Sequence, residues 1–269
     1  MLHIKTITGA LALMHINAGI TMAAPLLDEP FQYSTGSLVP NGGWTRFSGT
    51  EGQVDVVNDG SLTLPAPYPQ RTDTGAINLT FSESEDVAVG FTGAATVSSG
   101  SVYSGMLVRM TAIPGTGGAY LAMFKPDSAN TFDFYGRLWV KAIDASTYQF
   151  GISAASADSS SNPGVVPIYE TTARNLNETY HVVIKYEYVA GDSNDVASIF
   201  INPTPGTPEP ATPSATHTNS GVSDSTSIGS FALRQASGVG TMLLDDLRVG
   251  TTFADVAPAD ASVQEWTLY

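Results

Sequence analysis

Hydrophobic and polar residues alternate along many short segments of this chain, and no stretch keeps the three-to-four-residue spacing of a helix. Alternation predicts strands, because successive side chains of a strand point to opposite faces of a sheet. The segments with strand patterns are 53–58, 61–64, 76–81, 87–97, 102–113, 119–124, 132–143, 148–153, 180–189, 196–201, 228–235 and 241–249. So many short strands at close spacing predict an all-β sandwich or barrel. Asn58-Asp59-Gly60 predicts a hairpin turn between the first two segments.

Segment 132–143 alternates cleanly, and its two faces differ in chemistry. The apolar set is Phe132, Phe134, Leu138 and Val140. The polar and aromatic set is Asp133, Tyr135, Arg137, Trp139 and Lys141. The pattern therefore predicts that the first set packs on a core and that the second lies on an open sheet face.

Segment 180–189 shows the same alternation. One face would carry Tyr180, Val182, Ile184, Tyr186 and Tyr188. The other would carry His181, Val183, Lys185 and Glu187. One packed face and one wet face are typical of an antiparallel sheet.

The composition narrows the classes of protein that fit. A length of 269 residues suits one large sandwich domain. The absence of cysteine excludes thiol nucleophiles, thiolate metal sites and disulfides. A formal net charge of −14 disfavours nucleic acid as a partner, because phosphates and carboxylates repel each other.

Residues 1–23 have the layout of a secretory signal peptide, with Lys5 before an apolar stretch and small residues at Thr21 and Ala23. An uncleaved anchor is the alternative, but the stretch is shorter than the roughly 20 apolar residues of a membrane span. No later segment is apolar enough to span a bilayer, so we expect a secreted or cell-surface protein. Residues 24–257 would form the sandwich, with a Pro- and Thr-rich loop at 203–227, followed by a tail at 258–269.

Four segments of the later half carry a resemblance to a known family. They are Tyr180–Tyr186, Val196–Pro203, Ile228–Arg234 and Leu243–Gly250, the last reading Leu-Leu-Asp-Asp-Leu-Arg-Val-Gly. Their order resembles the laminin G-like branch of the concanavalin A-like lectin/glucanase superfamily, as found in secreted bacterial modules. The resemblance implies a two-sheet antiparallel jelly-roll sandwich. It leaves the function open, because this fold hosts lectins, hydrolases, lyases and scaffolding modules.

Paired carboxylates are the first candidate for chemistry, since glycoside hydrolysis needs two at a defined separation. Glu83 and Glu85 have suitable alternation, with Asp86 beside them, but they lie in a Ser-rich segment that favours a solvated turn. Asp245 and Asp246 are adjacent, and adjacent strand residues point to opposite faces. Neither pair predicts catalysis.

Sugar binding without catalysis does not require paired carboxylates. An aromatic ring packs on the C–H groups of a pyranose, and polar neighbours bind its hydroxyls. The candidate binding residues on segment 132–143 are Asp133, Tyr135, Arg137, Trp139 and Lys141. Arg109, His181 and Lys185 add cations and a proton carrier, which a polysaccharide lyase also uses to stabilise a uronate carboxylate. The motifs that mark such lyases are absent from the sequence.

Calcium is the one cofactor that the laminin G-like resemblance implies, and it takes hard oxygen ligands from loops. Asp192, Asn194, Asp195, Asp245 and Asp246 could supply them, although no segment matches a defined calcium loop. No two histidines have the spacing of a zinc site.

These observations favour a secreted, non-catalytic module that binds polysaccharide or serves a structural or adhesive role at the cell surface. Two alternatives stay open. One is a polysaccharide lyase or glycoside hydrolase that acts on the concave sheet face. The other is a self-associating subunit of a surface layer or filament.

Overall fold

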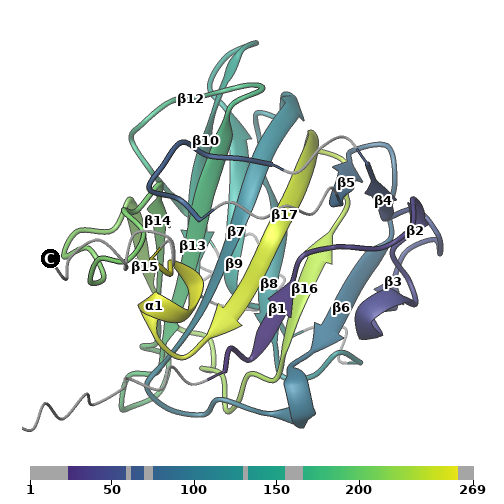
Figure 1. Cartoon of the computed structure of the whole chain (residues 1–269). Coiled ribbons are helices and arrows are strands. Elements are labelled where there is room, and N and C mark those ends of the chain that lie inside the picture. Colours follow the sequence, from purple (N-terminus) through teal and green to yellow (C-terminus); the bar gives the residue numbers. More distant parts are fainter. Residues whose placement is uncertain (1–23, 59–61, 70–74, 130–132, 155–165, 260–269) are drawn as a thin grey trace, which may run out of the picture.

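The computed structural model describes residues 24–58, 62–69, 75–129, 133–154 and 166–259. In these residues the chain folds into two antiparallel sheets that pack face to face (Figure 1). This confirms the all-β class predicted from the alternation and the two-sheet antiparallel sandwich implied by the resemblance. The predicted signal peptide, 1–23, and most of the predicted tail lie outside the described residues.

Sheet A has its longest strands in the middle. Among the described residues its strands follow the spatial order β15 (Ala215–Thr218), β14 (Val196–Ile201), β13 (Thr179–Glu187), β7 (Ser101–Ala112), β17 (Thr241–Gly250), β5 (Ala76–Thr80), β4 (Asp55–Val57) and β2 (Gly36–Ser37). β1 (Leu27–Glu29) also pairs with β17. Figure 1 shows β17 in yellow, running between β7 and β5.

Sheet B is the second layer. Its described strands follow the order β11 (Ile168–Tyr169), β10 (Thr147–Ser153), β9 (Tyr135–Ala142), β8 (Ala119–Lys125), β16 (Ser230–Arg234), β6 (Asp86–Gly90) and β3 (Thr45–Ser48). β12 (Arg174–Asn175) pairs with the start of β10. Two short 3-10 turns occupy Asn41–Gly43 and Thr92–Ala94.

The inner faces of the two sheets form one large hydrophobic core. Its largest fully buried members include Trp44, Tyr148, Tyr186, Phe150 and Phe231. The alternation predicted for segment 180–189 is confirmed on this side. Tyr180, Val182, Ile184 and Tyr186 belong to the core, and Tyr188 packs against it.

A short helix, α1 (Phe253–Val256), covers part of the outer face of sheet A. Thr252 and Asp255 cap its first turn reciprocally. Phe253, Val256 and the following Ala257 pack on buried residues of sheet A in a second cluster, which also contains Tyr103, Val183 and Phe200. The expectation that this face is wet is therefore wrong around Val183.

Two other sequence expectations are corrected. Residues 62–64, the described part of the second strand expected at the hairpin, are not a strand, and β4 pairs instead with β2 and β5. The turn triplet itself lies partly outside the described residues. The predicted loop 203–227 contains a strand, β15, which extends sheet A beside β14.

Two buried carboxylates fasten loops to the sandwich. Glu29 accepts hydrogen bonds from the Phe31 amide at 2.7 Å, the Tyr33 hydroxyl at 2.8 Å and the Trp44 indole at 3.0 Å. Glu85 accepts three from the backbone amides of residues 52–54, at 3.1, 2.7 and 2.7 Å. The side chain of Glu85 is 0% exposed, so the prediction that it lies in a solvated turn is wrong. Both carboxylates are structural, because each satisfies three donors.

Candidate functional site

The outer face of sheet B carries a row of aromatic rings that are only partly buried. Tyr120, Trp139 and Tyr169 come from β8, β9 and β11, and all three keep an intermediate exposure. The core-facing positions of β8, β9 and the intervening β10 are apolar, and they include Leu121, Leu138, Val140, Phe150 and Ile152. We refer to Tyr120, Trp139 and Tyr169 as the ring row.

Trp139 and Arg137 share one anchor. Ser153 lies on the neighbouring strand β10, and its hydroxyl accepts the Trp139 indole N–H at 2.9 Å and the Arg137 Nε–H at 3.2 Å. Arg137 is 3% exposed, with its guanidinium carbon 5.3 Å from the centre of the Trp139 ring. These bonds fix the indole on the sheet with part of its ring surface open.

Tyr120 links Trp139 to strand β16. Its ring meets that of Trp139 at a centroid distance of 5.2 Å in an edge-on arrangement. Two guanidinium groups lie over the same ring, Arg234 at 4.3 Å and Arg137 at 4.9 Å. Cations at this distance from a ring are held by its quadrupole.

Tyr169 lies across β10 because Gly151 has no side chain. A Cβ at Gly151 would stand 2.6 Å from Cδ1 of the tyrosine ring. The hydroxyl reaches Gly118, where a Cβ would stand 2.1 Å from it. Lys141 places its Nζ 4.1 Å from the ring centre. Burial raises the pKa of Tyr169 to about 12, so its hydroxyl stays protonated at neutral pH.

Replacing Gly151 with alanine should therefore displace the Tyr169 ring. We expect a loss of about 1–3 kcal/mol in the free energy of unfolding, the usual cost of an overpacked contact. Urea denaturation would measure it. Gly90→Ala is the matched control, since Gly90 lies in the same sheet with open space around it. Equal stability of the two variants would contradict the packing of Tyr169 over Gly151.

The other end of the same face is closed. Phe47 and Phe134 cover it, their ring centres 6.0 Å apart, over a floor of Ala88, Met123 and Ala232. Lys125 is fully buried there, with Nζ 3.5 Å from the Phe47 ring centre and no hydrogen-bond partner in the described residues. Burial lowers the pKa of Lys125 to about 8, although Asp127, Asp86 and Asp133 act in the opposite direction.

Tyr135 does not lie on this face, which corrects the sequence prediction. It is 8% exposed, and its ring packs in the core 5.7 Å from that of Tyr186. The cause is a β-bulge in β9. Between the pairs Ala122–Leu138 and Phe124–Tyr135, β9 contains one residue more than β8. Gly136 adopts the left-handed conformation that such a bulge needs, with φ of 54°. The bulge reverses the alternation on its N-terminal side, so Phe134 faces outward instead.

The eight binding residues expected from the sequence do not converge. Arg137, Trp139 and Lys141 share the outer face of sheet B, and Asp133 lies near enough to Lys125 to raise its pKa. Arg109, His181 and Lys185 lie on sheet A, the opposite layer. Arg109 sits on β7 opposite Leu243. Lys185 forms ion pairs with Glu187 at 2.9 Å and Glu209 at 3.1 Å.

His181 is sealed into sheet A. It is 1% exposed, and its ring meets that of Tyr68 edge-on at 4.9 Å. Neither ring nitrogen makes a hydrogen bond of ordinary geometry. Burial lowers the pKa of His181 to about 3, with a smaller opposing effect from the nearby Val256 carbonyl and a further lowering by Arg248. His181 is therefore neutral, and it cannot serve as a solvent-exposed proton carrier.

Asp245 and Asp246 reach the same face, contrary to the expectation from alternation. A second bulge, in β17, adds one residue against β7, and Asp246 has φ of 50°. Asp245 accepts the Leu62 amide at 2.9 Å, and Asp246 accepts the Tyr68 hydroxyl at 2.9 Å. The two carboxylates thus hold the segment 62–69 on sheet A.

The residues considered for calcium are divided between two places. Asp245 and Asp246 hold the segment 62–69, whereas Asn194 and Asp195 lie after β13, beside Asp224. Asp195 accepts the Tyr186 hydroxyl and the Val189 amide, both at 2.7 Å. In the described part of the chain, no three His, Asp or Glu side chains are grouped to hold a metal ion.

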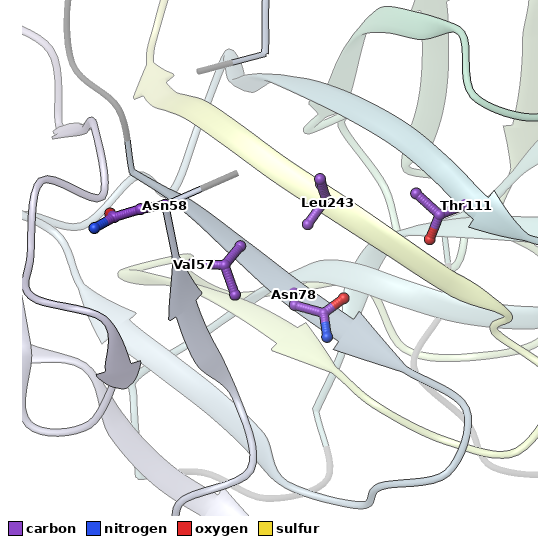
Figure 2. Close-up of a pocket in the computed structure, with 5 residues that line it drawn as sticks. All are labelled: Val57, Asn58, Asn78, Thr111 and Leu243. Atoms are coloured by element: carbon purple, nitrogen blue, oxygen red, sulfur yellow. The ribbon is translucent and has the colours of Figure 1, made fainter. Parts of the chain in front are cut away.

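A hollow of about 560 Å³ opens on the outer face of sheet A (Figure 2). It is lined by Val57, Asn58, Asn78, Thr111 and Leu243, which come from β4, its end, β5, β7 and β17 (Figure 2). Two amides and a hydroxyl could bind polar groups there. Among the described residues the lining has no aromatic ring and no charged group, so they offer less to a sugar than the ring row does.

Three residues of the sheet B face were missed by the sequence analysis. Tyr120 sits in the apolar segment 119–124, Arg234 is the last residue of β16, and Tyr169 lies in a two-residue strand. Gly151 was the one local signal, because a glycine inside a strand often marks the close approach of another group.

Comparison with known proteins adds the following. No protein-family model matches the chain, and no curated protein matches it in sequence. Solved structures with a similar fold include the catalytic domain of a glycoside hydrolase family 131 protein from Coprinopsis cinerea, at 10% identity and a TM-score of 0.49, covering 88% of this chain and 99% of its own. The globular domain of T. cruzi calreticulin has 9% identity and a TM-score of 0.48, covering 87% and 90%.

Alginate lyase vAL-1 from Chlorella virus has 9% identity and a TM-score of 0.46, covering 81% of this chain and 98% of its own. Similarity at this level bears on the fold and not on ligand or chemistry. In the described residues, no helix is long and apolar enough to cross a membrane.

Proposed function

We propose that this chain is a secreted, non-catalytic carbohydrate-binding module, and that its ligand lies along the ring row of sheet B. The observation that carries the proposal is the pair formed by Tyr120 and Trp139. The two rings meet at 5.2 Å, are partly exposed, and are fixed by Ser153 and the flanking guanidinium groups. Rigid rings with polar neighbours suit the apolar and hydroxyl surfaces of a pyranose.

The polar groups around the rings hold the rings in place and are not arranged to transfer protons. The Arg137 Nε–H and the Trp139 indole N–H are both committed to Ser153. The two described histidines lie elsewhere, His181 in sheet A and His217 in β15. Asp86 is 8% exposed and accepts the Gln235 amide, so its carboxylate is largely closed to a ligand.

The test is binding of purified protein to a panel of polysaccharides and oligosaccharides, followed by product analysis after long incubation. We expect saturable binding to at least one glycan without cleavage. Trp139→Ala should weaken it tenfold or more, about 1.4 kcal/mol, because a stacking surface is lost. Trp139→Phe should retain most of the affinity.

Phe81→Ala is the matched control. Phe81 is an aromatic residue that is 54% exposed, and it lies outside the ring row, just after β5. Its removal should leave binding unchanged. Cleavage products would overturn the non-catalytic assignment in favour of a lyase or hydrolase. Absence of binding to the whole panel, or binding that is indifferent to Trp139, would contradict the proposed site.

A further inference from the structure

The cations of this protein are few and unevenly placed. Lysine and arginine together number 11 in a chain of net charge −14. Among the described residues, four of them lie on the outer face of sheet B, namely Lys125, Arg137, Lys141 and Arg234. Lys125 and Arg137 are buried, whereas Lys141 and Arg234 are partly exposed. A partly exposed cation on an otherwise acidic protein attracts anionic groups to that place.

Three cations elsewhere in the described structure are paired with carboxylates. Arg174 pairs with Glu170, and Lys185 pairs with Glu187 and Glu209. Arg248 pairs with Asp246 at 3.3 Å and with Asp28 at 3.6 Å. These side chains have no charge left to offer to a ligand.

Lys141 and Arg234 are held differently, by aromatic rings. Lys141 lies over Tyr169 at 4.1 Å, and Arg234 lies over Tyr120 at 4.3 Å. In the described residues neither has a carboxylate within ion-pair distance. A ring stabilises a cation by about 0.5–1 kcal/mol at an exposed site without cancelling its charge. Asp86 lies opposite Arg234 on β6, and its carboxylate attracts the guanidinium.

The two cations flank the ring row. Arg234 stands on β16 at one end, and Lys141 stands against Tyr169 at the other. The ring row runs from β8 across β9 and β10 to β11, three inter-strand steps, which at about 4.8 Å each make roughly 14 Å. That length accommodates several sugar units with a positive charge at either end.

We propose that the glycan bound along the ring row is anionic and carries the carboxylates of uronic acids. This inference rests on the proposed function and adds the ligand's charge. The rings take the apolar faces of the sugars, and Lys141 and Arg234 pair with carboxylates spaced along the chain. A carboxylate that accepts an N–H from a cation forms a charge-assisted bond, about twice as strong as a neutral one.

The test compares one polymer in two charge states. Binding of polygalacturonate and of its fully methyl-esterified form is measured by calorimetry between low and high salt. We expect the acid form to bind at least tenfold more tightly than the ester, and this preference to shrink as salt rises, because screening weakens exposed charge pairs. Lys141→Gln and Arg234→Gln should each reduce affinity for the acid form several-fold.

Lys185→Gln is the matched control, since Lys185 is committed to two glutamates on sheet A. It should leave affinity unchanged. Equal affinity for acid and ester, or for neutral glycans alone, would overturn this inference while the proposed function stands. Binding of dextran sulfate without polygalacturonate would overturn the carboxylate assignment. Failure of every glycan, neutral or charged, would overturn both.

Discussion

Replacing Glu85 with alanine should lower the free energy of unfolding by about 2–4 kcal/mol, because one buried and two partly buried amide donors lose their acceptor. The carboxylate is 0% exposed and receives the amides of Gly52, Gln53 and Val54. It joins the start of β6 to the segment that leads into β4, and so connects the edges of the two sheets. A loss of this size is a large share of the roughly 5–15 kcal/mol that stabilises a typical domain.

Urea denaturation would measure the effect, with Glu83→Ala as the control two residues away. Glu83 is partly exposed, so its removal should change stability by less than about 0.5 kcal/mol. Glu85→Gln should fall between the two, since an amide offers one acceptor oxygen in place of two. Equal stability of the two alanine variants would contradict the structural role of Glu85.

Lowering the pH should reduce the free energy of unfolding, because His181 is buried as a neutral imidazole. Burial lowers the pKa of this side chain from 6.5 to about 3, so the native state binds a proton far less readily than the unfolded chain does. The stability that the neutral imidazole of His181 contributes is fully present above about pH 6.5 and is lost as the pH falls toward 3. Each pH unit in that window removes up to about 1.4 kcal/mol.

Denaturation of the wild type and of His181→Phe at pH 7, 6, 5 and 4 would isolate this effect. Phenylalanine keeps a ring against Tyr68 and cannot be protonated, so the variant should lose less stability on acidification. His181→Asn is a second variant of smaller volume in case the larger ring disturbs packing. Parallel stability curves for the wild type and both variants would show that His181 does not titrate in the window.

The alternation of side chains predicted most of the strands, and it failed where the backbone inserts a residue. In segment 180–189 no bulge interrupts β13, and every predicted orientation is correct. In segment 132–143 the bulge at Gly136 turns Tyr135 inward and Phe134 outward. A one-residue insertion moves every preceding side chain to the other face, and alternation alone does not reveal it.

The candidate site was predicted only in its central part. Trp139, Arg137 and Lys141 belong to one strand, so local periodicity places them together. Tyr120, Tyr169 and Arg234 reach the same face from other strands, and their proximity depends on the order of strands in sheet B. Arg109, His181 and Lys185 have suitable chemistry but lie in the opposite sheet, because alternation does not say which layer a strand joins.

The outer faces of the two sheets therefore differ in how far other segments of the chain cover them. α1 and the segment 62–69 pack on sheet A, where His181 is enclosed and the bulged aspartates hold the covering chain. Sheet B is covered at its Phe47 end and carries partly exposed rings along β8 to β11. An aromatic face left open beside a filled one is where a binding site is expected.

The most direct test of the central claim is to map where a bound glycan touches the protein, by following backbone amide and tryptophan indole resonances during titration with the tightest ligand from the panel. The account predicts the largest shifts at the Trp139 indole and at amides near Tyr120, Ser153 and Tyr169. The Trp44 indole, buried on Glu29, should not move. Shifts concentrated instead around the hollow of sheet A, at Asn78 and Leu243 (Figure 2), would contradict it.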